Sequence, residues 1–73
     1  MFSGERLREL RKERGLNREQ VAEKVGVLPR TITFYETNGR MPSAEKLYAL
    51  AEFFEVSLDY LFKRTDHREI RRG

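Results

Sequence analysis

Residues 26–40 read GVLPRTITFYETNGR and combine a tight turn with a short helix. Pro29 suits the first position of that helix, because its missing N–H would have no partner there in any case. Asn38 and Gly39 both tolerate positive φ, so they predict a turn where the helix ends. The stretch therefore predicts a helix over residues 29–37.

The outer face of this helix follows from its period of about 100° per residue. If Ile32 faces the core, the side chains of Leu28, Tyr35 and Glu36 lie near the same side. The opposite side and its flanks then carry Arg30, Thr31, Thr33, Phe34 and Thr37. Arginine can bond guanine in a fork, and a threonine methyl or a phenyl ring can contact a thymine methyl. From the pattern alone, a solvated arginine and a core or dimer role for the phenylalanine remain alternatives.

Four further helices are predicted around this one, and no strand pattern is present. The first helix, about 5–14, is expected to start at Ser3 and stop at Gly15. The second, about 18–25, is expected to start at Asn17 with Gln20 and stop at Gly26. Pro42 and Ser43 are expected to open the fourth helix, and Ser57 a short fifth. The apolar positions expected to face inward are Leu7, Leu10, Leu16, Val21, Ala22, Val25, Leu47, Leu50, Ala51, Phe54, Leu58, Leu61 and Phe62. The expected fold is all-α, a five-helix domain over residues 1–62.

The last eleven residues, KRTDHREIRRG, are charged and nearly free of apolar side chains. We therefore expect residues 63–73 to form a frayed tail or a linker.

The composition excludes several kinds of site and of protein, but it indicates no particular function. A chain of 73 residues without Cys predicts one domain with no deep pocket, no disulfide and no thiolate metal site. Its apolar runs are too short to span a bilayer, and MFSGERLREL lacks the core of a signal peptide, so a cytoplasmic protein is expected. The net charge of +3 suits an anionic partner but is weak evidence alone.

Two further interactions are predicted from position on the helices. Glu36 faces inward and needs a partner, and Arg11 lies on the inward edge of the first helix, so an Arg11–Glu36 ion pair is expected. Phe53 and Tyr60 do not fit the inward register of the fourth and fifth helices. They could form an exposed apolar patch and a dimer interface, or be ordinary surface aromatics.

An enzyme is a weak alternative, because the one histidine, His67, lies in the charged tail. Asp59 and Asp66 have no metal-ligand spacing, so no metal and no cofactor are expected. A second alternative is a helical protein-interaction module, such as an antitoxin-like adaptor that binds a protein partner through Phe53 and Tyr60.

Several linked stretches resemble one family. GLNREQVAEKVGV, TITFYE and RMPSAEKLYALAEFFEVSLDYLF resemble the Cro/repressor-type helix-turn-helix domain of phage repressors and bacterial regulators, with residues 3–62 covered. The resemblance implies a lambda-repressor-like fold of five helices, the third of which enters the major groove. It also implies a regulator of transcription, commonly a repressor, that binds a palindromic double-stranded operator as a homodimer.

The resemblance implies roles for individual residues. Base contacts fall on Arg30, Thr31, Thr33 and Phe34, and phosphate contacts on Asn17, Arg18, Thr37, Asn38 and Arg40. The chain departs from the family pattern in three places. Arg18 replaces the usual Gln, Leu28 and Pro29 replace polar residues at the helix start, and Phe34 replaces a polar or basic side chain. We therefore expect specificity to depend on Arg30, the threonines and DNA shape.

Overall fold

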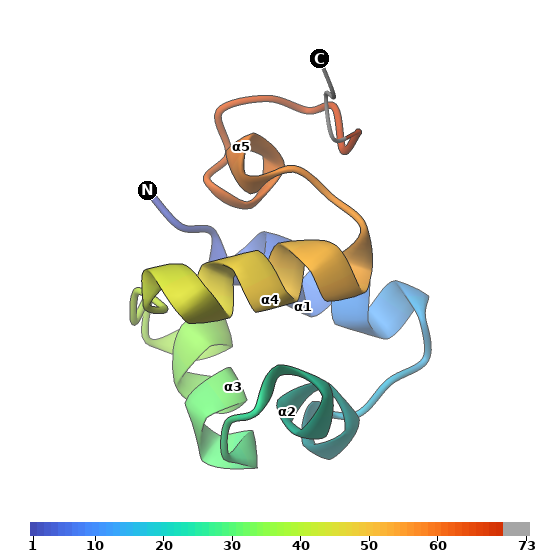
Figure 1. The fold of residues 1–73 in the computed structure, drawn as a ribbon, viewed down its shortest axis with the longest axis vertical. Helices are drawn as coiled ribbons and strands as arrows, with labels where there is room; N and C mark the ends of the chain where they lie inside the picture. The colour runs from blue at the N-terminus through green and yellow to red at the C-terminus, as the bar shows by residue number, and fades with distance from the viewer. Residues whose placement is uncertain (70–73) are drawn as a thin grey trace.

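The computed structural model describes residues 1–69 and contains five helices within that range. They are α1 (Gly4–Glu13), α2 (Arg18–Val25), α3 (Pro29–Thr37), α4 (Ala44–Phe54) and α5 (Leu58–Leu61). The all-α prediction is confirmed, and the predicted bounds of the third helix match those of α3. In Figure 1, α4 crosses the middle of the molecule, with α2 and α3 at one end and α5 at the other.

Side-chain caps begin four of the five helices. The hydroxyls of Ser3, Ser43 and Ser57 each accept a hydrogen bond from the backbone N–H three residues later. At α2 the Asn17 side chain accepts from the backbone N–H of Gln20 at 2.8 Å, and the Gln20 side chain accepts from the Asn17 N–H at 2.9 Å. This reciprocal pair is the capping box that the sequence predicts.

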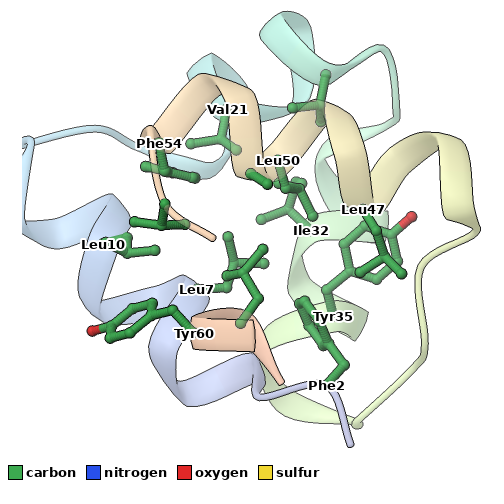
Figure 2. Packing of buried hydrophobic residues seen from close by; sticks show 14 of the residues in the cluster. Phe2, Leu7, Leu10, Val21, Ile32, Tyr35, Leu47, Leu50, Phe54 and Tyr60 are labelled. Atoms are coloured by element: carbon green, nitrogen blue, oxygen red, sulfur yellow. The ribbon is translucent and has the colours of Figure 1, made fainter. Parts of the chain in front are cut away.

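The core gathers where all five helices of the described residues converge. Figure 2 shows Leu7, Ile32 and Leu50 at its centre, and all three are fully buried. α3 packs against both α1 and α2, while α5 packs against α1 and α4. Phe2 lies edge-on to Tyr35, with ring centroids 6.3 Å apart, and closes the core beneath α3. Two sides of α3 are thereby fixed, which leaves its outer face free.

Leu16, Leu58 and Phe62 are only partly buried, whereas the core includes Phe2 and Val56, which the pattern did not select. Leu28 is 57% exposed rather than turned inward. Leu28 precedes α3 in an extended conformation. The rotation of 100° per residue that was used to turn its side chain inward therefore does not apply to it.

Tyr60 also differs from expectation, because it is buried rather than part of an exposed patch. Its ring lies 4.2 Å from the guanidinium carbon of Arg6, and its hydroxyl accepts from Nε of Arg68 at 3.1 Å. Phe53 is half-buried and packs edge-on against Phe54 at 4.9 Å. The predicted exposed patch of Phe53 and Tyr60 is therefore wrong.

The segment of residues 63–69 folds back over α5 and α1 instead of fraying. Arg6 donates to the carbonyl oxygen of Thr65 and, at 2.7 Å, to a carboxylate oxygen of Asp66. The backbone N–H of Ser57 donates to the carbonyl oxygen of Arg68 at 2.8 Å. These contacts contradict a frayed tail as far as residue 68, whereas the alternative of a linker stays a prediction. Residues 70–73 lie outside the described residues.

Within residues 1–69, no helix combines the length and the apolar composition needed to cross a membrane.

Candidate nucleic-acid interface

The outer face of α3 carries the four side chains predicted to contact bases. Arg30 is exposed, while Thr31, Thr33 and Phe34 are half-buried. Arg30 follows Pro29 at the first turn of the helix, so its guanidinium can extend beyond the protein surface. The structure thus brings a forked donor and two threonine methyls onto one short stretch of surface.

The threonine hydroxyls on this face are partly occupied by the helix itself. Thr37 donates to the carbonyl oxygen of Thr33 at 2.7 Å, and its hydroxyl also lies 3.2 Å from the side-chain oxygen of Asn38. A hydroxyl has one proton to donate, so Thr37 would have to give up an internal bond to donate to a phosphate.

The turn after α3 returns the chain over the end of this face. Asn38 ends the helix by donating its backbone N–H to the carbonyl oxygen of Phe34 at 3.0 Å. Gly39 then adopts a φ of 66°, which glycine reaches without steric cost. The turn brings the guanidinium of Arg40 to 4.8 Å from the Phe34 ring centroid. Asn38 and Arg40, two of the predicted phosphate contacts, are both exposed at this turn.

The other predicted phosphate contacts lie at the start of α2. Asn17 uses its side-chain oxygen and its backbone N–H in the capping box, so its side-chain NH₂ remains the group that could reach a phosphate. The Arg18 side chain is 35% exposed, and its Nε donates to a carboxylate oxygen of Glu36 at 3.1 Å.

Glu36 is the buried acceptor of two arginines. Its side chain is fully buried, and its two oxygens accept from Nε of Arg11 at 2.7 Å and from Nη2 of Arg11 at 3.1 Å. The structure thus brings Arg11 and Glu36 together and adds Arg18, which sequence reasoning did not place in this cluster. Because α1, α2 and α3 each supply one member, the cluster holds α3 against the body of the domain.

Tyr35 supports α3 from behind. Its ring is buried against Phe2, and burial raises the pKa of its hydroxyl, an effect that the positive charge of Arg40 partly offsets. The phenol therefore stays neutral at physiological pH, and the charge on this part of the surface comes from the arginines.

The histidine of the segment after α5 lines one pocket together with Asp59 and Glu69. His67 is exposed, and its backbone N–H donates to the Thr65 hydroxyl at 3.1 Å. Among residues 1–69, no three His, Cys, Asp or Glu side chains are grouped as a metal site would require.

Comparison with known proteins gives a consistent set of matches. Residues 4–67 match the family described as "Helix-turn-helix domain". The uncharacterized HTH-type transcriptional regulator YobD of Bacillus subtilis (strain 168) is 42% identical over 62 residues, which cover 85% of this chain and 55% of YobD. The cryptic phage CTXphi transcriptional repressor RstR of Vibrio cholerae is 41% identical over 58 residues, which cover 80% of this chain and 51% of RstR.

A solved structure, the P22 c2 repressor protein in complex with synthetic operator 9T, superposes with a TM-score of 0.78 at 33% identity. The match covers 84% of this chain and 92% of that one. The chain spans little more than half the length of YobD and RstR. The family match extends past residue 62, the predicted domain boundary, to residue 67. Sequence, fold and the arrangement of α2 and α3 agree, and this chain belongs to the helix-turn-helix domain family.

Proposed function

We propose that this chain is the sequence-specific, double-stranded DNA-binding domain of a transcriptional regulator, most simply a repressor. The observation that carries the proposal is a set of three arginines around α3. Exposed Arg30 lies in the first turn of α3, Arg18 on α2 pairs with Glu36 near its end, and exposed Arg40 follows in the next turn. Such a set offers a forked donor for base edges together with charges for phosphates. The P22 repressor, which has the same fold, was solved on its operator.

In this mechanism α3 enters the major groove and its first turn reads the bases. Arg30 forks onto a guanine, and the methyl groups of Thr31 and Thr33 contact thymine. Arg18, Asn38 and Arg40 contact the backbone on either side and set the register of the helix in the groove. The matched relatives are named as regulators, so the activity proposed is binding rather than catalysis. We propose that the protein acts in the cytoplasm.

A homodimer on a palindromic operator completes the proposal, because one domain of this size makes few base contacts. Tyr60 is buried and Phe53 is half-buried, so we place the proposed dimer contact on the neighbouring surface of α4 and α5. There Tyr48 is 63% exposed beside a groove of about 700 Å³ whose lining includes Leu58. Sedimentation of a Tyr48→Glu variant tests this contact. A mass equal to that of the wild type would show that Tyr48 does not hold the dimer together.

Selection of binding sites from random duplex DNA with the purified domain tests the function itself. We expect an enriched motif that contains guanine and thymine, and binding that weakens as salt rises because phosphate contacts release counterions. Two inverted half-sites about one helical turn apart would support the dimer. Recovery of no motif, together with no binding to any duplex at low salt, would refute the proposal.

A further inference from the structure

The guanidinium of Arg40 and the ring of Phe34 form a stacked pair at the edge of the recognition surface. The guanidinium carbon lies 4.8 Å from the ring centroid, well inside the distance of about 6 Å at which a cation interacts with an aromatic face. Arg40 is exposed and Phe34 is half-buried, so the pair lies at the protein surface with its charged end in water. One face of the ring is therefore already occupied in the free protein.

The backbone fixes the same two residues relative to each other. The carbonyl oxygen of Phe34 accepts from the N–H of Asn38 at 3.0 Å and from the N–H of Arg40 at 3.4 Å. Gly39 makes this return possible through its φ of 66°. The turn thus brings Arg40 over Phe34. The stack therefore follows from the backbone conformation and not only from the rotamer of the Arg40 side chain.

A third observation places the charge of Arg40 close to the body of the domain. The Coulombic effect of Arg40 opposes the rise in the pKa of the Tyr35 hydroxyl that burial causes. Arg40 therefore stacks on one aromatic side chain of α3, that of Phe34, and its charge acts on a second, that of Tyr35.

We propose that Phe34 is a positioning residue that holds Arg40 ready for a DNA phosphate, rather than a residue that reads a base. The inference rests on the proposed DNA-binding function and changes the role of Phe34 within it. A free arginine loses rotamer freedom when it binds, and an arginine that is stacked beforehand loses less. One face of the ring supports the guanidinium in the free protein.

The two roles of Phe34 make different predictions for a leucine at this position. Leucine keeps an apolar side chain that can touch a thymine methyl, but it has no ring to support a cation. If Phe34 reads a base, Phe34→Leu changes the preference at one base pair. If Phe34 positions Arg40, Phe34→Leu weakens binding to every sequence by the same factor and leaves the preferred motif unchanged.

A double-mutant cycle on binding tests the inference. The proteins are the wild type, Phe34→Leu, Arg40→Ala and the double variant, each titrated with the selected operator and with a random duplex of equal length. We expect Phe34→Leu to weaken both by about two- to fivefold, the factor that an exposed cation–π pair supplies. Its salt dependence should match that of the wild type, because no charge is removed. Arg40→Ala should reduce the salt slope by about one, and the double variant should bind no more weakly than Arg40→Ala.

Phe34→Tyr is the matched control, because it keeps the ring and should bind as the wild type does. The NMR shift of the Arg40 side-chain protons in free protein gives a readout that needs neither DNA nor a folded variant. We expect an upfield shift from the ring of Phe34 in the wild type. Additive losses in the cycle, a changed base preference for Phe34→Leu, or unshifted Arg40 protons would each overturn the inference. A wild type that binds no duplex would instead refute the proposed function.

Discussion

Arg68 and Glu13 face each other across 55 residues of sequence and join the segment after α5 to the end of α1. The two terminal nitrogens of Arg68 donate to the two carboxylate oxygens of Glu13 at 2.7 and 2.6 Å. The Nε of the same guanidinium donates to the Tyr60 hydroxyl. One arginine thus closes the segment over α5 and explains why Tyr60 is buried.

The pH dependence of stability should report this contact. The Arg68 guanidinium lowers the pKa of the Glu13 carboxyl below its usual 4.5. A lowered pKa means that the ionised carboxylate stabilises the fold above pH 4.5, and that this contribution is lost as the pH falls through the folded-state pKa. We expect Glu13→Gln to be slightly less stable than the wild type at pH 7 and equal to it well below pH 4. Chemical denaturation at several pH values measures the difference.

The effect should be small, because both side chains are about half exposed and surface ion pairs contribute little. Hydrogen exchange is the sharper measurement. The N–H of Ser57 donates to the carbonyl oxygen of Arg68, so Arg68→Ala should speed exchange at Ser57. Arg64→Ala, which removes another exposed arginine of the same segment, is the control. Unchanged exchange in Arg68→Ala would show that the side chain does not hold the segment down.

The cluster around Glu36 predicts a ranked set of stability losses. Glu36→Ala leaves Arg11 buried without its carboxylate and should cost about 3–5 kcal/mol. Arg11→Ala should cost less, because Arg18 remains to pair with the carboxylate. The double variant Arg11→Ala/Glu36→Ala should lose less than the sum of the single variants. Thermal and denaturant melts measure all three, with the exposed neighbour Lys12→Ala expected to stay within about 0.5 kcal/mol of the wild type. Additive losses would show that Arg11 and Glu36 do not stabilise each other.

Arg30 should determine specificity if α3 reads the major groove. Arg30→Ala is expected to cost about 1–3 kcal/mol of binding free energy on the selected operator and to relax the preference at one base pair. Arg18, which pairs with Glu36, gives the contrast, because we propose that it contacts a phosphate and not a base. Arg18→Ala should weaken operator and random DNA alike and lower the salt slope by about one. Fluorescence anisotropy with both duplexes at several salt concentrations separates the two effects. Equal losses on both duplexes for Arg30→Ala would rule out its role in base reading.

The helices and the buried face of α3 could be predicted because both follow from local rules. Caps and turn residues mark the ends of helices, and a rotation of 100° per residue turns Glu36 inward when Ile32 is buried. Arg11 could be paired with Glu36 for the same reason, since a carboxylate on an inward face needs a partner. Arg18 was missed from the cluster because its position depends on how α2 packs against α3.

The errors fall where local rules give little information. α5 has only four residues, too few for a period to set the register of Tyr60. The segment after α5 is charged, and its contacts with Arg6 and Glu13 lie more than fifty residues away in the sequence. Nothing in the segment's own pattern indicates such pairing. The stack of Phe34 with Arg40 could not be predicted either, because it depends on the turn at Gly39.

Gly4 of α1 lies directly against the backbone of α3, and it gives a test of how α3 is seated. A Cβ at this position would lie 2.2 Å from the carbonyl oxygen of Tyr35 and 2.8 Å from that of Glu36. Backbone atoms cannot turn aside as a flexible side chain can, so Gly4→Ala must push the two helices apart. We expect a loss of about 1–3 kcal/mol from overpacking. Binding to DNA should weaken as well, because α3 shifts relative to α2.

Gly15→Ala is the matched control for this substitution. Gly15 has a φ of 65° with no neighbouring atom within 4 Å of an added Cβ, so its loss of about 1 kcal/mol should come from backbone conformation alone. Gly4 has no positive φ, and alanine would otherwise favour the helix there. Denaturant melts should therefore show a larger loss for Gly4→Ala than for Gly15→Ala, accompanied by weaker DNA binding only in the former. If the Gly4→Ala protein were as stable as the wild type, α1 and α3 would not be in backbone contact. The placement of α3 against Gly4 would then be incorrect.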